Sequence, residues 1–223
     1  MTSLYIIGDS HVEVFKYAEK NNLSKEIDIL GSCMAPGRTA QGLNKIENRK
    51  IFINRAKSDF KGNADYIALQ FGEIDCGYTL WSRMDIHNTN KKTEIEFAIK
   101  GITLLANDIK RYATKNVIFL GPIIPLISKY NNNIPESISK RKTVNADHKE
   151  RTELVLWFCK EMKKEVKRLG YIYTDINKQL LDPVTQLVKS NYKDKKSLHH
   201  LGAAVGAHLW INNLTATINR QGN

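Results

Sequence analysis

The 223-residue sequence lacks a long hydrophobic run, which argues against a membrane-spanning helix. Its longest apolar stretch, Val117 to Ile127, is interrupted by Gly121, Pro122 and Pro125. A membrane-spanning helix needs roughly 20 apolar residues. The N-terminus also has no basic segment before Asp9, so no signal peptide is expected. We therefore expect a cytoplasmic protein.

Cysteine is scarce, and the common cofactor motifs are missing. Cys33, Cys76 and Cys159 form no CxxC pair, which argues against a disulfide framework and a thiolate zinc site. The sequence has no HExxH motif and no clustered His/Asp spacing, so no metal site is expected. It has neither GxxxxGK[ST] nor GxGxxG, so a nucleotide cofactor has no support. We expect a protein that works without a cofactor.

Acidic residues are scarce relative to basic ones in the second part of the chain. Residues 1–90 carry eleven basic and eleven acidic residues, whereas residues 91–223 carry twenty-three and twelve, and this gives the net charge of +11. A one-sided basic surface can attract nucleic acid, anionic polysaccharide or a membrane face. The alternative, a solvated lysine-rich surface, is the more common outcome. With 42% hydrophobic and 26% charged residues, the chain is expected to fold as a single domain over 1–223.

Short apolar runs alternate with amphipathic segments along the whole chain. This alternation predicts an α/β fold with a parallel sheet covered on both faces, whose ligands bind outside the carboxyl edge of the strands. The irregular segment Ile123 to Asn145 is either a lid, an interaction loop or, as we favour, a surface insertion. The predicted strands are 4–7, 27–30, 66–71, 116–120 and 171–173, and the predicted helices are 12–20, 39–57, 95–112, 154–169 and a last helix after His200.

Ser10 is the strongest candidate for a catalytic residue, because it lies where the first predicted strand ends and a helix begins. A hydroxyl there is exposed, and the backbone N–H groups that follow can hold an oxyanion. The pair His199–His200 comes after the fifth strand and is expected at the same edge, with Asp194 upstream to orient an imidazole. A helix cap at Ser10 and a surface histidine pair are the alternatives that spacing leaves open.

Four short segments carry a family resemblance that covers nearly the whole chain. In this order along the chain they resemble the conserved blocks of the SGNH, or GDSL-like, hydrolases. The resemblance implies a three-layer α/β/α sandwich with a five-stranded parallel sheet of flavodoxin-like order. The segments are Ile7-Gly8-Asp9-Ser10-His11, Pro36-Gly37-Arg38-Thr39-Ala40, Phe71-Gly72-Glu73-Ile74-Asp75 and Leu198-His199-His200-Leu201-Gly202.

The resemblance also implies roles for individual residues. Ser10 would be the nucleophile, His200 the base and Asp194 the acid. The backbone N–H groups of Ser10 and Gly37 would stabilise the oxyanion. The remaining candidates for oxyanion or substrate binding are Gly72, His11, Glu73 and Arg38. For His11 a polar role at the helix start, and for Glu73 a turn-capping role, remain open; for Asp75 we favour bonding to backbone N–H groups.

Two positions depart from the family pattern. Ile74 stands where the third block has an asparagine whose amide donates to the oxyanion, and loss of such a donor costs on the order of a hundredfold to a thousandfold in rate. Arg38 and Gln70 are candidates to replace it. The acid three residues before the histidine is also missing, because Ser197 occupies that place before His200. Asp194 or a backbone carbonyl would then orient the imidazole.

The leading hypothesis is an acyl-ester enzyme, either an esterase or an O-acetyltransferase, that acts on a carbohydrate or polysaccharide precursor. Its partner would be a small-molecule or saccharide ester, anionic ones included. The alternative is a catalytically impaired carbohydrate-binding protein with the same fold. Nucleic-acid binding through Lys140, Arg141 and Lys142 and through Lys193, Lys195 and Lys196 ranks last, and no nucleic-acid partner is expected.

Overall fold

Five parallel strands form the centre of the protein. The computed structural model describes residues 1–59, 63–127, 136–185, 187–194 and 199–221. The strands pair in the order β2-β1-β3-β4-β5, which confirms the predicted parallel sheet of flavodoxin-like order. Their bounds are Thr2–Gly8 for β1, Ile27–Met34 for β2, Ala64–Gln70 for β3, Ala113–Leu120 for β4 and Ile172–Thr174 for β5.

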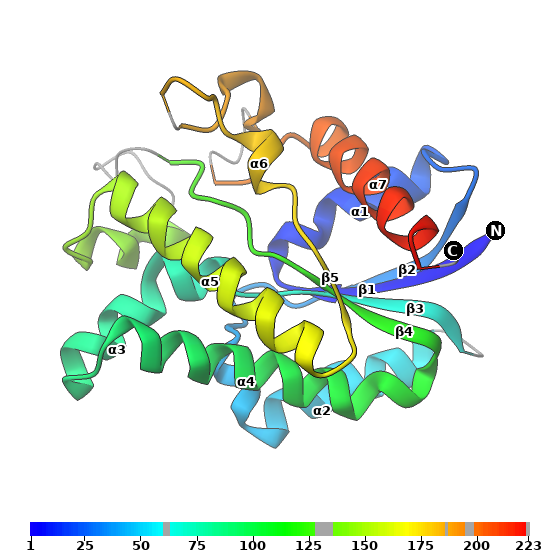
Figure 1. Cartoon of the computed structure of the whole chain (residues 1–223), viewed down its shortest axis with the longest axis horizontal. Coiled ribbons are helices and arrows are strands. Elements are labelled where there is room, and N and C mark those ends of the chain that lie inside the picture. Colours follow the sequence, from blue (N-terminus) through cyan, green and yellow to red (C-terminus); the bar gives the residue numbers. More distant parts are fainter. Residues whose placement is uncertain (60–62, 128–135, 186, 195–198, 222–223) are drawn as a thin grey trace.

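Helices cover both faces of this sheet and give the predicted three layers (Figure 1). Helices α1, Glu13–Lys20, and α7, Ala203–Asn219, pack against each other on one face. The other face carries α2, Ile46–Asp59, together with α4, Lys91–Ile109, and α5, His148–Arg168. The central strands are buried on both faces, and this is why they read as continuous apolar runs in the sequence.

The helical segments differ from the prediction in several places. Helix α5 begins at His148, six residues before the predicted start, because Asp147 caps it. The expected helix 39–57 is a 3₁₀ turn, Gln41–Asn44, followed by α2, because Lys45 takes an extended conformation between them. A π-helical turn, Asp75–Thr79, and α3, Leu80–His87, follow the third strand without having been predicted. Only Leu80 and Trp81 of α3 are buried, so this helix lacks a repeating apolar pattern. A short helix α6, Asn177–Leu180, follows β5.

Gly8 allows β1 to leave the sheet next to β3. A Cβ atom on Gly8 would lie 2.4 Å from Cγ1 of Val12 and 2.5 Å from the carbonyl oxygen of Gln70. The next residue, Asp9, donates its backbone N–H to that same Gln70 carbonyl at 3.1 Å. This close approach fixes where Ser10 emerges at the carboxyl edge of the sheet.

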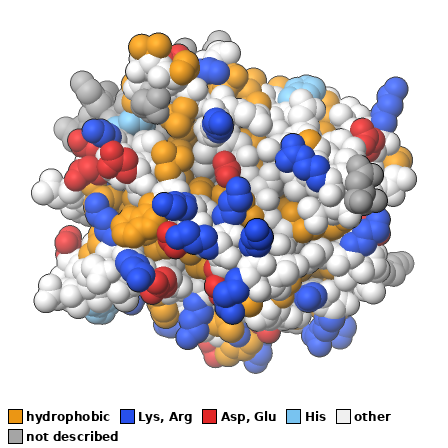
Figure 2. Space-filling view, in the orientation of Figure 1, with side chains coloured by type: hydrophobic (Ala, Val, Ile, Leu, Met, Phe, Trp, Pro, Cys, Tyr) orange, Lys and Arg blue, Asp and Glu red, His pale blue; other side chains and the backbone are white. Residues whose placement is uncertain are grey.

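Lys and Arg side chains outnumber the acidic ones on the face in Figure 2. One hollow of the surface is lined by five lysines, namely Lys160, Lys163, Lys164, Lys167 and Lys178. The sequence predicted that Arg141 could contact phosphates together with Lys140 and Lys142. Arg141 is buried, so it is not available to a phosphate.

Part of the irregular segment 123–145 lies outside the described residues; the part from Glu136 to Thr143 is 3₁₀ helical. Within the described residues, every helix is too short or too polar to cross a bilayer.

Candidate active site

Ser10 begins a 3₁₀ turn, Ser10–Val12, between β1 and α1. Asp9 precedes this turn with an extended backbone, and its carboxylate accepts the backbone N–H of His11 at 2.9 Å. This capping bond lets the chain pass directly from strand to helix. Ser10 is half-buried and lies at the end of the two central strands.

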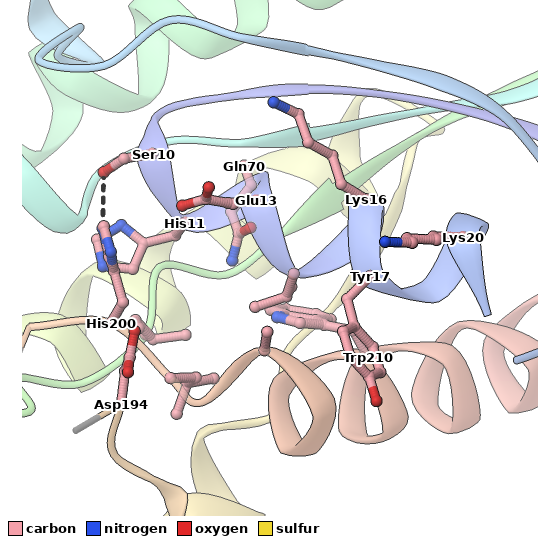
Figure 3. Close-up of a pocket in the computed structure, with 14 residues that line it drawn as sticks. Ser10, His11, Glu13, Lys16, Tyr17, Lys20, Gln70, Asp194, His200 and Trp210 are labelled. Atoms are coloured by element: carbon pink, nitrogen blue, oxygen red, sulfur yellow. Dashed lines mark hydrogen bonds between the residues drawn. The ribbon is translucent and has the colours of Figure 1, made fainter. Parts of the chain in front are cut away.

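His200 meets Ser10 from the far end of the sequence. Nε2 of its ring lies 3.0 Å from Oγ of Ser10, although 190 positions separate the two residues (Figure 3). The loop that carries the imidazole is held by its backbone. Asp194 donates its N–H to the His200 carbonyl, and Gly202 donates to the Tyr192 carbonyl, each at 2.9 Å. The structure thus brings together the hydroxyl and the base that the resemblance implied.

A second imidazole, His11, is buried beside this pair. Its Nδ1 lies 3.0 Å from a carboxylate oxygen of Asp9, and its Nε2 lies 3.2 Å from the carbonyl oxygen of His199. Both partners are acceptors, so this environment favours the protonated ring, which can donate from both nitrogens. Burial opposes this charge, but the carboxylates of Asp9 and Glu73 outweigh it and raise the pKa of His11. The ring thereby connects the Ser10 turn to the His199–His200 loop.

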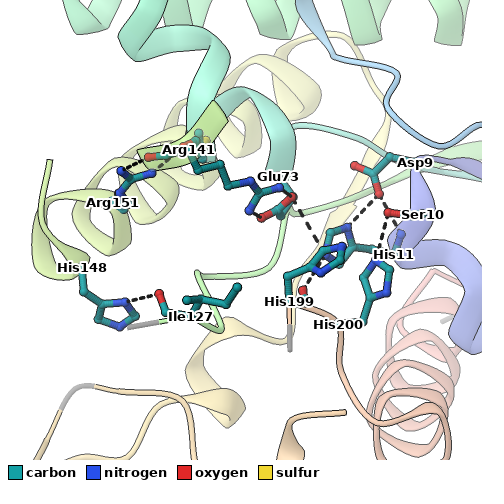
Figure 4. A network of polar contacts seen from close by, with 12 residues as sticks. Asp9, Ser10, His11, Glu73, Ile127, Arg141, His148, Arg151, His199 and His200 are labelled. Carbon is teal, nitrogen blue, oxygen red and sulfur yellow. Dashed lines mark hydrogen bonds and ion pairs between the residues drawn. The ribbon is translucent and has the colours of Figure 1, made fainter. Parts of the chain in front are cut away.

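Glu73 lies at the back of this network and forms a buried ion pair. Nη1 and Nη2 of Arg141 donate to its two oxygens at 2.5 and 2.7 Å, and its Oε2 lies 4.0 Å from Nε2 of His11 (Figure 4). Burial would raise the pKa of Glu73, but Arg141 and His11 together lower it to about 2. Two carboxylates, Asp9 and Glu73, thus balance the two cations His11 and Arg141 inside the protein.

Comparisons with known proteins bear on the fold. No family model and no curated protein matches the sequence. Solved structures do match. A GDSL-like lipase from Bacteroides thetaiotaomicron has a TM-score of 0.60 and 12% identity over 99% of this chain and 89% of its own. A catalytic mutant of an acetylxylan esterase from Geobacillus stearothermophilus has a TM-score of 0.56 and 12% identity over 97% and 94%. An extracellular lipase from Streptomyces rimosus has a TM-score of 0.56 and 11% identity over 97% and 100%.

The chain has the SGNH hydrolase fold. The carboxyl edge of β1, β2 and β3 accordingly carries the first three blocks of the resemblance. Gly37 lies exposed just after β2 with a φ of 74°, and the N–H of Ala35 donates to the Gly8 carbonyl at 2.9 Å, which ties this loop to β1. Gly72 is buried after β3 with a φ of 112°. The oxyanion roles of Gly37 and Gly72 stay predictions.

Asp75 holds the second and third blocks of the SGNH fold together. Its buried carboxylate accepts the backbone N–H groups of Ala40 at 2.7 Å and Gln41 at 3.0 Å. Burial raises the pKa of Asp75 to about 7, against the effect of these donors. The side chain therefore binds backbone N–H groups, as favoured above, and two of them belong to the neighbouring loop.

The other candidates for oxyanion or substrate binding lie apart from Ser10 or are engaged by the protein. Arg38 donates from Nη1 to Oδ1 of Asn48 at 2.8 Å. His11 and Glu73 belong to the buried network. Gln70, by contrast, lines the same cavity as Ser10. Ile74 is half-buried, and its side chain has no group that can donate a hydrogen bond.

The low basicity of His200 is the main electrostatic feature of the site. Burial, and after it the positive charge of His11, lowers the pKa of His200 to about 3. Asp194 lines the same cavity as His200 and opposes this shift through its charge, as the smallest of the named causes. At neutral pH His200 is uncharged and able to accept the Ser10 proton, but it is a weak base in the free protein.

A cavity of about 360 Å³ opens beside Ser10 and His200 and runs between α1 and α7. Its walls are mainly apolar. Lys16 and Lys20 are exposed at α1 and line it as well. Among the described residues, no group of three or more His, Cys, Asp or Glu side chains could hold a metal ion.

Sequence reasoning missed two members of the buried network. Asp9 was considered only as part of the turn after the first strand and as a cap of the helix that follows, and Arg141 only as one charge in a basic run. One sequence signal could have identified Asp9 as a member of the site: it directly precedes Ser10 and His11, which both face the site. Nothing in the sequence connects Arg141 with Glu73, which lies 68 residues away.

Proposed function

We propose that the protein is a serine-dependent ester hydrolase or O-acyltransferase that acts on a carbohydrate or polysaccharide precursor. The observation that carries this proposal is the 3.0 Å contact between Oγ of Ser10 and Nε2 of His200 at the edge where SGNH-fold enzymes are expected to hold their site. A nucleophilic serine needs an adjacent base, and this contact provides one.

In the proposed reaction, Ser10 attacks the ester carbonyl while His200 takes its proton. The backbone N–H groups of Ser10 and Gly37 face the carbonyl oxygen as it becomes negative. His200 then gives its proton to the leaving alcohol, which leaves an acyl-serine. Water or a sugar hydroxyl attacks this acyl group, His200 accepts the proton of the attacking group, and Ser10 recovers its proton.

A carbohydrate substrate is supported by chemistry at the site and by a similar structure. The acetylxylan esterase that matches this fold acts, by its name, on an acetylated polysaccharide. Lys16 and Lys20 on the cavity wall, beside Glu13 and Asp194, offer charged groups that would hydrogen-bond the hydroxyls of a saccharide. We propose one domain over residues 1–223 and a cytoplasmic location.

A second candidate function is carbohydrate binding with little or no turnover. Ile74 removes one oxyanion donor, and the pKa of about 3 makes His200 a weak base in the free protein. Both features lower the rate without altering the cavity. Under this alternative the protein would bind a saccharide and leave its ester bond intact.

The deciding experiment compares the wild type with Ser10→Ala. We expect wild-type protein to hydrolyse p-nitrophenyl acetate and to be labelled at Ser10 by a fluorophosphonate. Ser10→Ala should lose the labelling and at least a hundredfold of the turnover. Adding sugar acceptors separates transfer from hydrolysis, because transfer yields an acetylated sugar. Equal rates for both proteins, with no labelling, would leave only the binding function.

A further inference from the structure

A basic groove runs between α5 and β5, the strand at the edge of the sheet (Figure 1). It consists of two adjoining hollows of about 600 and 580 Å³, which share Lys163, Lys167, Tyr173 and Asp175. Asp175 is the one acidic residue among the described residues that line it. No residue of the groove lines the cavity beside Ser10, so the two are separate. The cations of the groove are Lys160, Lys163, Lys164, Lys167, Lys178 and Arg220.

Three exposed lysines of the groove, Lys160, Lys163 and Lys167, form one face of α5. They are three, four and seven positions apart, and residues at these spacings lie on the same side of a helix. Like charges four residues apart destabilise a helix. Among the described residues, none of the three has a carboxylate within ion-pair distance. The chain thus keeps an unfavourable charge arrangement on this face, and a bound anion would relieve it.

The acidic residues in the same part of α5 do not neutralise the groove. Glu161 pairs with Lys164 at 2.8 Å, and Glu165 pairs with Arg168 at 2.7 Å. Neither carboxylate lines the groove. Both are therefore engaged outside it, and the positive charge of the three lysines is left for a partner.

The spacing of the charges requires an anion with several charges. A helix rises about 1.5 Å per residue, so the Cα atoms of Lys160 and Lys167 lie about 10 Å apart along the axis. One phosphate or carboxylate cannot contact both ends of this row. Between the charges, Leu156, Leu181 and the aliphatic stems of the lysines provide apolar walls, which suit the C–H faces of sugar rings. A chain of sugar rings that carry carboxylates matches both features.

Two other classes of polyanion match the groove less well. Single-stranded nucleic acid is held by aromatic rings on which its bases stack. The aromatic residues of the groove are Tyr171, which is buried, and Tyr173, which is half-buried. The surface of a bilayer is nearly flat and would meet the rim of a hollow rather than its inside. The shape and the walls of the groove therefore favour a saccharide.

We propose that the basic groove between α5 and β5 binds an acidic saccharide chain, a polymer of uronic acids, through Lys160, Lys163 and Lys167. The choice of a saccharide rests on the proposed function, whereas the need for a multivalent anion rests on the groove alone. Because the groove is separate from the cavity beside Ser10, it binds the chain whether or not an ester is cleaved.

Binding of decagalacturonate to the intact protein tests this inference, with maltodecaose as the neutral chain of equal length. At 50 mM salt we expect the acidic chain to bind at least tenfold more tightly, and to lose affinity as salt rises. Lys163→Glu combined with Lys167→Glu should weaken its binding at least tenfold. The control, Lys50→Glu with Lys57→Glu at exposed positions of α2, changes the net charge equally and should weaken binding less than threefold.

The inference is wrong if decagalacturonate binds no more tightly than maltodecaose, or if the two double variants weaken its binding equally. Tighter binding of phosphatidylglycerol vesicles or of a 30-nucleotide single strand would assign the groove to a membrane or to nucleic acid instead. The same titration on Ser10→Ala separates this inference from the proposed function. If decagalacturonate binds both proteins but the wild type hydrolyses no ester, the groove stands and the enzymatic function fails. Hydrolysis by the wild type without binding of the chain has the opposite meaning.

Discussion

The ring of His11 contacts Asp9, Glu73 and the His199 carbonyl. Mutation can distinguish the roles of its two nitrogens. A glutamine at this position can still donate to the His199 carbonyl from roughly the place of Nε2, whereas an asparagine can reach only Asp9. Neither carries a charge. The two variants therefore distinguish the effect of the His11 cation from the effect of the His199 anchor.

We expect His11→Gln to move the acidic limb of kcat/KM to higher pH, because the cation that helps to lower the pKa of His200 is gone. His200 must be neutral to accept the Ser10 proton, so activity is lost as pH falls through its pKa. His11→Asn should show the same shift and also lose about a hundredfold in kcat, because the His200 loop is no longer held. Acidic limbs that coincide with that of wild type would show that His11 does not act on His200.

The ion pair between Glu73 and Arg141 yields a prediction for stability. Glu73→Gln should lower the free energy of unfolding by about 3–5 kcal/mol at pH 7, since it leaves a buried guanidinium without its anion. Glu73→Gln combined with Arg141→Met should recover part of this loss. Chemical denaturation of the three proteins measures both effects.

The ion pair between Glu73 and Arg141 also predicts how the free energy of unfolding changes with pH. The pKa of Glu73 is lowered from 4.5 to about 2, so its contribution is complete above pH 4.5 and is lost as pH falls through about 2. The stability difference between wild type and Glu73→Gln should therefore shrink between about pH 5 and pH 2. A difference that stays constant over this window would mean that the pair contributes nothing as an ion pair.

At the residue scale, the sequence was informative only where a motif and a strand end coincide. Ser10 and His200 could be predicted because each follows a strand and belongs to a recognisable block. The ion pair of Glu73 with Arg141 could not, since 68 residues separate its partners. The charge of His11 also depends on two acceptors, one of which is 188 residues away.

At the element scale, α4 and the second block of the resemblance are in direct contact. A Cβ atom on Gly101 of α4 would lie 2.1 Å from the carbonyl oxygen of Ala40. That oxygen belongs to the loop whose N–H groups bind Asp75. A small residue at this helix position therefore sets the distance between α4 and the loop after Gly37.

We expect Gly101→Ala to destabilise the protein by about 1–3 kcal/mol through this overlap, even though alanine is the better helix former by about 1 kcal/mol. Gly202→Ala is the matched control, because its Cβ would have no neighbour closer than 3.8 Å and its φ is −55°. The control should change stability by less than about 1 kcal/mol. Thermal unfolding of both variants measures the effect, and equal melting temperatures would contradict the tight packing.

The strands were easier to predict from the sequence than the helices. Buried strands consist of apolar runs that end at glycine or polar residues, as at Gly8 and Gly72. The helical turn after Gly72 has no such pattern, and a tertiary contact helps to hold it: Nη1 of Arg151 donates to the Gly77 carbonyl at 2.6 Å. Contacts of this kind are not visible in local sequence.

At the scale of the whole molecule, the net charge of +11 is the feature that a partner would meet first. Several basic side chains are engaged within the protein, although the acidic residues that pair with them are already counted in the net charge. Arg49, Arg141 and Arg151 are buried. Lys92, Lys149, Lys164 and Arg168 each pair with a carboxylate on their own helix. A high net charge with this distribution favours solubility and weak attraction of anions over a specific nucleic-acid site.

We therefore expect only weak, sequence-independent binding to nucleic acid, which weakens steeply as salt rises because each neutralised phosphate releases counterions. Electrophoretic mobility shifts with a 30-base-pair duplex and a 30-nucleotide single strand, at 50 and 200 mM salt, measure this. Any complex at 50 mM salt should be gone at 200 mM, and unrelated sequences should compete equally. A complex that survives 200 mM salt with nanomolar affinity would restore nucleic-acid binding as a function.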